Sequence, residues 1–142
     1  MRSIESHFER VIVGKVEPDE DLITSIIEMI KKFNIKSGLI NSIGALKKFT
    51  LGYFDFDSKE YLKKNFEENV ELVSCMGNIS YKEGVPIVHL HASIGIKDYT
   101  IFGGHLFQPS ITSITCEVYI VEIDKKLNRI EDPQLGLSLL NI

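Results

Sequence analysis

The sequence is poor in the residues that mark several classes of protein. It contains no tryptophan, only four prolines and only two cysteines among 142 residues. Two cysteines cannot build a disulfide framework, so we interpret Cys75 and Cys116 as reduced, buried thiols. No stretch approaches the roughly 18 apolar residues of a membrane-spanning helix. The first ten residues, MRSIESHFER, lack an apolar signal-peptide core. We therefore expect a cytoplasmic protein with no membrane partner.

An excess of positive charge is also absent. Sixteen lysines and arginines stand against 20 aspartates and glutamates, which gives a net charge of −4. Adjacent lysines occur as isolated pairs, at 31–32, 47–48, 63–64 and 125–126. Strong binding to nucleic acid depends on a dense basic surface that displaces counterions from phosphates. The composition therefore disfavours autonomous DNA binding, although an oligomer could bring scattered pairs together.

What the sequence does contain is the ordinary balance of a globular chain. Apolar residues make up 44% and charged residues 25%. A chain of this length can bury a core without disulfide bonds or a structural metal. No internal repeat, linker or low-complexity stretch divides it, so we expect one domain over residues 1–142.

One segment has the period of an amphipathic helix. Apolar residues between Leu22 and Phe33 recur at spacings of three and four. Pro18 and the four carboxylates at 17 and 19–21 suit the start of a helix, where negative charge is favourable. The pattern predicts a helix over residues 19–33 that ends near Asn34.

The remaining apolar segments have a period of two, which is typical of strands. We predict strands at residues 8–16, 37–46, 49–56, 70–81, 86–94, 99–107 and 111–123. Turn-like pieces, such as Gln108-Pro109-Ser110, separate them. Short connections favour antiparallel pairing, so the fold class is α+β: a mostly antiparallel sheet or sandwich with one helix packed on a face. We expect the apolar end, residues 135–142, to pack on the domain or on a neighbouring subunit.

Three of the four histidines fall within residues 89–105. His89 and His91 are two residues apart on a predicted strand, so their side chains share a face while Leu90 points into the core. The chain then turns near residues 97–98 and returns as a strand that carries His105. If these two strands form a hairpin, His105 approaches the other two histidines.

Three converging imidazoles predict a metal site. Neutral imidazole is a good ligand for zinc and other divalent ions, and three protein ligands leave one position open. We expect Gly103 and Gly104 to allow a bulge or unusual backbone angles that re-aim His105. The alternative is a set of ordinary packed or surface histidines, because an H-x-H pair alone often arises by chance.

Glu117 stands within an apolar strand, where a carboxylate without a partner is costly. It either accepts a hydrogen bond from a metal-bound histidine or bound water, as an outer-sphere group or a general base, or lies on a solvated face. Nucleophilic alternatives are weaker, because Ser93 has no obvious carboxylate to orient a Ser–His pair. No catalytic residue is assigned.

Several segments together resemble the PPC family, the plants-and-prokaryotes-conserved domain found behind AT-hooks in plant nuclear proteins. They are HLHASIGIKDYTIFGGHLF (89–107), ITCEVYIVE (114–122), INSIGAL (40–46), VELVSCMGNIS (70–80) and RIEDPQLGLSLL (129–140). The resemblance covers residues 8–140 and is to the stand-alone prokaryotic type. It implies a compact α+β fold, usually a homotrimer, with His89, His91 and His105 as metal ligands. It implies no particular reaction.

Three functional hypotheses follow. The leading one is a homotrimer that binds one divalent metal ion, zinc, through the three histidines. The second is a DNA-associated regulator that acts as a trimer; the net charge and the absence of the Arg-Gly-Arg-Pro core of an AT-hook disfavour it. The third is an enzyme that uses a metal-bound water, with Glu117 as base.

Overall fold

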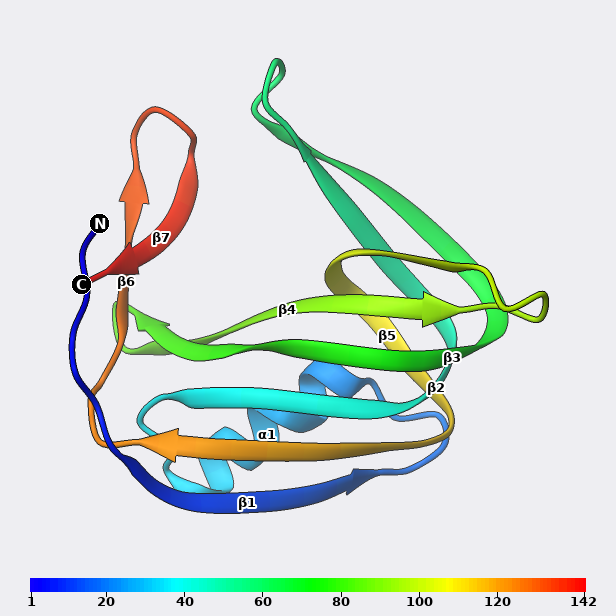
Figure 1. Ribbon diagram of the computed structural model, residues 1–142, viewed down its shortest axis with the longest axis horizontal. Helices are drawn as coiled ribbons and strands as arrows, with labels where there is room; N and C mark the ends of the chain where they lie inside the picture. The colour runs from blue at the N-terminus through cyan, green and yellow to red at the C-terminus, as the bar shows by residue number, and fades with distance from the viewer.

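The computed structural model describes residues 1–142 and combines one α-helix with seven β-strands (Figure 1). In chain order the elements are β1 (Phe8–Val16), α1 (Leu22–Phe33), β2 (Gly38–Asp55), β3 (Glu60–Lys82), β4 (Val85–Gly95), β5 (Ile101–Ile123), β6 (Asn128–Asp132) and β7 (Leu137–Asn141). Every strand pairing is antiparallel except one, between β3 and β6. The α+β class is confirmed, with most of the chain in strands. No helix has both the length and the hydropathy that a membrane crossing requires.

The long strand β5 is used twice in the sheet. Its N-terminal part pairs with β4, where His105 lies opposite His91. Its C-terminal part pairs with β1 and β2, so that Tyr119 lies between Val13 and Asn41. Since β2 also pairs with β3, and β3 with β4, these four strands form a closed ring of pairings. In Figure 1 the yellow start of β5 lies near β4, and its orange end lies between β1 and β2.

Helix α1 begins three residues later than the sequence predicts. The side chain of Asp21 accepts a hydrogen bond from the backbone N–H of Thr24 at 2.9 Å, which makes Asp21 the N-cap. Asp19 has a φ of 72°, which a right-handed helix excludes, so the acidic run precedes the first turn instead of forming it. The predicted end is confirmed, because Asn34 adopts the left-handed C-cap conformation.

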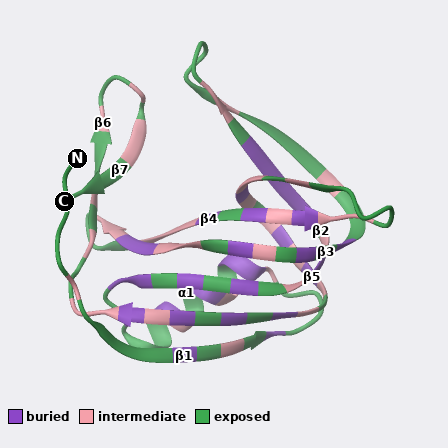
Figure 2. Cartoon of the chain, viewed as in Figure 1, coloured by how far each residue is buried: buried purple, intermediate pink, exposed green.

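The core lies between α1 and the inner face of the sheet. Leu22, Ile26 and Ile30 of the helix are almost completely buried and join one cluster with residues of β1 to β5, including Val118 and Ile120. Cys75 and Cys116 are free, buried thiols in this cluster, as predicted. Figure 2 shows the buried residues alternating with exposed ones along the strands. Burial of one side of each strand therefore fixes the pairing register.

The outer face of the sheet, opposite the helix, remains apolar in places. Val13, Tyr119, Asn41, Met76 and His91 lie side by side in register across β1, β5, β2, β3 and β4. Val13, Tyr119 and Met76 are exposed large apolar residues in this row. The outer face that carries the histidines is thus continuous with an exposed apolar surface.

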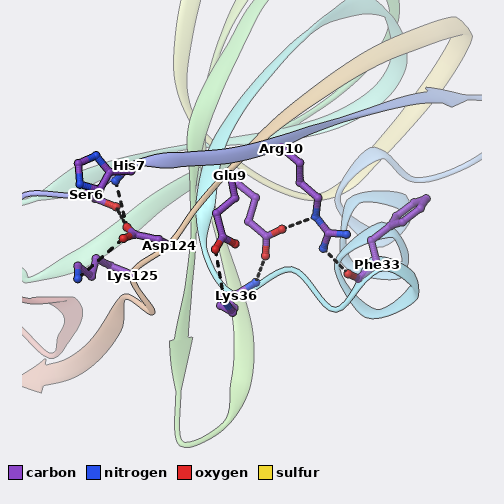
Figure 3. Close-up of polar contacts among 9 residues, drawn as sticks. Ser6, His7, Glu9, Arg10, Phe33, Lys36, Asp124 and Lys125 are labelled. Atoms are coloured by element: carbon purple, nitrogen blue, oxygen red, sulfur yellow. Dashed lines mark hydrogen bonds and ion pairs between the residues drawn. The ribbon is translucent and has the colours of Figure 1, made fainter.

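Polar contacts fasten β1 to the end of β5 (Figure 3). Glu122 is only 2% exposed, and its carboxylate accepts hydrogen bonds from Arg10 at 2.5 Å and from the backbone N–H of Lys36 at 2.8 Å. Asp124 accepts bonds from Ser6 and from the backbone of His7. A buried carboxylate needs such partners, so Glu122 has a structural role here.

Two predicted breaks in the sheet do not exist. The segments predicted as strands 37–46 and 49–56 form one strand, β2. Gln108-Pro109-Ser110 is also not a turn, because it lies within β5. Pro109 has no N–H to donate to a neighbouring strand. The N–H of the next residue, Ser110, donates to the carboxylate of Asp21 at 2.7 Å instead of to a strand.

Two other segments lie outside the core. Strand β3 begins at Glu60, ten residues earlier than predicted. Residues 60–67 pair with the far end of β2 in a hairpin that projects from the sheet (Figure 1). The prediction missed this part because its polar and apolar residues do not alternate. The C-terminal residues 128–141 form the β6–β7 hairpin, which joins β3 through one strand pair, Tyr81 with Asn128, and through side-chain contacts such as that of Arg129 with Ser80. Leu139 and Leu140 stay 39% and 38% exposed, so this end does not enter the core.

Candidate metal centre

The three predicted histidines converge at one place on the outer face. His89, His91 and His105 each offer a ring nitrogen, and these nitrogens all lie within 4.8 Å of one another. The ring centroids of His89 and His91 are 5.2 Å apart, those of His89 and His105 are 5.0 Å apart, and those of His91 and His105 are 5.4 Å apart. The group contains no carboxylate and no cysteine.

The β4–β5 hairpin brings these histidines together. The turn closes where the N–H of Ile96 donates to the carbonyl of Thr100, at 3.1 Å. From there the pairing runs without a register shift to His91 opposite His105. Leu90 between the two β4 histidines is fully buried, as the alternation predicts. The hairpin proposed from the sequence is therefore confirmed.

The glycines before His105 work by removing bulk and not by bending the strand. Gly103 and Gly104 pair regularly with Ser93 and Ala92, and neither has a positive φ, so the expected bulge is absent. A Cβ at Gly103 would collide with the carbonyl oxygen of Ala92, and one at Gly104 would lie 2.8 Å from the carbonyl oxygen of Gly52. Glycine thus lets β5 approach β4 on one side and β2 on the other.

The surroundings of the cluster keep two of its imidazoles, those of His89 and His105, neutral. Burial and the nearby Arg129 and His91 lower the pKa of His89 to about 4. Burial, the other two histidines, Lys63 and Arg129 lower the pKa of His105 to about 4. Neutral imidazole is the charge state that metal binding requires, and both side chains are in that state at physiological pH.

One atom of the cluster is direct evidence for a ligand from outside the chain. The Nδ1 atom of His105 is buried and has no hydrogen-bond partner in the chain. Buried polar atoms are nearly always satisfied, and an unsatisfied one points to a group that the polypeptide does not supply. Three converging imidazoles, one with an orphaned ring nitrogen, fit a divalent metal ion of the zinc type.

A second set of residues around the histidines was not predicted. Arg129 of β6 lies 3.2 Å from His89 Nδ1 and donates to Asn78, Ser80 and the carbonyl of Ser138. Asn78 is directly opposite His89 in the β3–β4 ladder, so strand register could have suggested it. Arg129 had no sequence signal, because it comes from a hairpin that only the fold places beside β4.

Two aromatic rings and a lysine lie next to His105. The ring of Phe107 is 4.3 Å from the ring of His105, and that of Tyr61 is 5.1 Å away. The ammonium of Lys63 lies over Phe107, 4.1 Å from the ring centroid. Tyr61 and Lys63 belong to the polar start of β3, where the sequence predicted no strand.

Glu117 does not join the cluster. It is exposed on β5, opposite Lys15 of β1 and Ile43 of β2. It shares the outer face with the histidines, but β2 and β3 separate it from β4. At about 4.8 Å per strand this amounts to a distance of about 14 Å. The geometry places Glu117 on the solvated face, which was one of its two predicted positions.

The thiols do not form a reactive site either. Burial, with a smaller effect of Cys116, raises the pKa of Cys75 to about 12, and burial also raises the pKa of Cys116. A thiolate nucleophile requires a lowered pKa, so both cysteines act as core residues.

Comparisons with known proteins agree with this fold. The model of the Plants and Prokaryotes Conserved (PCC) domain matches residues 3–124. A metal-containing protein from Archaeoglobus fulgidus is 33% identical, with a TM-score of 0.91 and all of both chains covered. A plant- and prokaryote-conserved (PPC) protein from Pyrococcus horikoshii is 34% identical, with a TM-score of 0.90, 100% of this chain covered and 98% of that one.

Two further relatives are more distant. A candidate DNA-binding protein from Bacteroides thetaiotaomicron is 27% identical, with a TM-score of 0.88 and 96% of both chains covered. The bifunctional protein GlmU of Synechococcus sp. is 24% identical over 135 residues, which are 94% of this chain and 20% of that protein, so the chain spans a fifth of its length. The family model and the Pyrococcus structure agree on one assignment. The chain belongs to the Plants and Prokaryotes Conserved domain family.

Proposed function

We propose that this protein binds one divalent metal ion, zinc, through His89, His91 and His105. The observation that carries the proposal is the convergence of three ring nitrogens within 4.8 Å. The neutral state of His89 and His105 and the orphaned Nδ1 of His105 support it. Zinc is favoured because borderline-soft imidazole suits it and because three protein ligands leave an open coordination position.

We also propose that three copies of this protein form a homotrimer. Its outer face carries exposed apolar residues on neighbouring strands, among them Val13, Leu39, Met76 and Tyr119. A contiguous apolar surface of this kind is typically covered by another subunit. Light scattering at micromolar concentration should give three times the monomer mass of 16.1 kDa, and a monomer would contradict the proposal.

Metal analysis of protein purified without a nickel column or chelator tests the metal site. We expect one zinc per chain in the unaltered protein and none in the His89→Ala/His105→Ala double variant. His7→Ala is the matched control, because this fourth histidine lies at the N-terminus outside the cluster. Full metal occupancy in the double variant would reject the site, and loss of metal in the His7 variant would show that histidine removal acts indirectly.

DNA association is the second candidate function, and it rests on the Bacteroides relative described as a candidate DNA-binding protein. Its charge requirement is poorly met, since the chain has a net charge of −4. Gel shifts at increasing salt separate the two functions, because metal binding without a DNA shift favours the first.

A further inference from the structure

We propose that the histidine cluster, when it holds its metal, binds a small oxyanion, a carboxylate or a phosphate, with Arg129 and Lys63 as its cationic partners. The inference rests on the proposed metal site and names the class of ligand for that site. It follows from which charges surround the histidines and from how Arg129 contacts His89.

Arg129 is a guanidinium without a carboxylate. Its side chain makes four polar contacts, all with uncharged groups: the hydroxyl of Ser80, the carbonyl of Ser138, the amide oxygen of Asn78 and the ring of His89. It takes part in no ion pair, although it is half-buried. Buried charges are normally paired, so an anionic partner from outside the chain is the missing element.

The contact between Arg129 and His89 cannot coexist with a metal on a neutral His89. A guanidinium only donates hydrogen bonds, so Nδ1 of His89 must accept at 3.2 Å. Neutral His89 then carries its proton on Nε2 and has no lone pair left for a metal. When His89 acts as a ligand, this N–H of Arg129 therefore loses its acceptor beside the site. An oxyanion is the acceptor that matches a guanidinium best.

Lys63 adds a second positive charge near His105. Its ammonium lies over Phe107, whose ring packs 4.3 Å from that of His105. Lys63 also has no ion-pair partner, whereas seven other cation–carboxylate pairs form elsewhere in the chain. Arg129 lowers the pKa of both His89 and His105, Lys63 lowers that of His105, and no carboxylate is among the groups that shift either pKa. The site is thus cationic in a chain that is acidic overall.

Titration of the cobalt(II)-loaded protein with oxyanions tests the inference. Acetate and inorganic phosphate serve as probes, imidazole serves as a neutral ligand, and the visible absorption of cobalt reports binding. We expect Arg129→Gln to weaken the binding of acetate or phosphate by at least about tenfold, since hydrogen bonds to charged groups contribute about 1.5–3 kcal/mol. Lys63→Gln should weaken it by roughly two- to fivefold, as for an exposed charge. Imidazole affinity should stay within about twofold in both variants.

Lys64→Gln is the matched control. Lys64 is the next residue of β3 and lies over Phe66, 4.9 Å from its ring centroid, so it has the same charge on the other face. It should leave oxyanion affinity unchanged. Arg129→Lys keeps the charge without the planar guanidinium and covers the case in which Arg129→Gln disturbs the β6–β7 hairpin.

The outcomes separate the two proposals. Failure to load cobalt in the unaltered protein contradicts the metal site itself. If cobalt loads but neither probe changes its spectrum, the oxyanion inference is wrong while the metal site stands. Equal oxyanion affinity in the unaltered protein, Arg129→Lys and Lys63→Gln also overturns it. Preference for phosphate over acetate, or the reverse, identifies which oxyanion the site takes.

Discussion

Two regions of the molecule share the long strand β5 but are built on different principles. Where α1 covers the sheet, the inner side chains of β1, β2 and β5 are apolar and nearly inaccessible, as Ile26 and Ile120 illustrate. At the histidine end, β4 and the start of β5 present polar rings that are partly exposed. Arg129 and Lys63, both without ion pairs, stand beside these rings.

The difference separates what stabilises the fold from what gives it a chemical property. The helix-covered region gains its stability from burial of apolar area, which is nondirectional and tolerates many arrangements. The histidine end depends on the direction of a few nitrogens, and its charges act against folding unless a ligand compensates them. We therefore expect substitutions in one region to leave the main property of the other unchanged.

Ile26→Ala should have the largest effect on stability. Ile26 is completely buried in the core, and truncation of such a side chain costs about 2–5 kcal/mol of unfolding free energy. Denaturant titration of metal-free protein measures this loss, and metal stoichiometry should be unchanged below the transition.

His91→Ala should have the opposite effect, with little loss of stability. It should cost under about 0.5 kcal/mol of unfolding free energy, as for a surface position. A large loss of stability in the metal-free His91 variant would break the comparison.

Gly103→Ala should lower both the stability of the fold and the affinity of the histidines for zinc, so it tests whether the two regions are independent. The new methyl group would collide with the carbonyl of Ala92 and force β5 away from β4. Overpacking of this kind costs about 1–3 kcal/mol and should also move His105 relative to His91. Thermal unfolding and zinc affinity measure the two consequences. Unchanged zinc affinity would mean that the close approach of the strands does not position the site.

Asp21→Ala should cost about 1 kcal/mol, the usual value of an N-cap. Burial opposes the charge of Asp21, but hydrogen bonds from Thr24 and Ser110 prevail, so its pKa lies below the ordinary 3.8. Because the folded-state pKa is the lower one, this stability is present above the unfolded pKa and is lost as pH falls through the folded value. Denaturation at neutral and acidic pH should therefore show a difference that shrinks below pH 3.8. Asp57→Ala, an exposed turn residue, should show no such difference.

DNA binding should give the smallest effect. With a net charge of −4, the assembled protein should bind duplex DNA no better than about 10⁻⁴–10⁻⁶ M at physiological salt. Fluorescence titration across a salt series measures both affinity and slope. Nanomolar, sequence-selective binding would show that the histidine end, with Arg129 and Lys63, binds nucleic acid and not a small oxyanion.

Local patterns determined the elements that lie within the core. The three-and-four spacing from Leu22 to Phe33 identified the helix, because its apolar stripe must face the sheet. The alternation around Leu90 and the turn near residue 97 identified the β4–β5 hairpin and, with it, all three histidines. Residues 60–69 escaped prediction because a two-stranded projection open to solvent needs no apolar alternation.

The sequence by itself determined the helix, most of the strands, the net charge of −4 and the identity of the three clustered histidines. These depend on neighbours within about ten residues or on composition, which the chain carries locally. Only the tertiary structure decided that β5 continues through Pro109, that β2 and β3 separate Glu117 from β4, and that Arg129 and Lys63 lie beside the histidines. These depend on contacts between residues 40 or more positions apart, and closure of the ring of strands, which no local period encodes, brings those residues together.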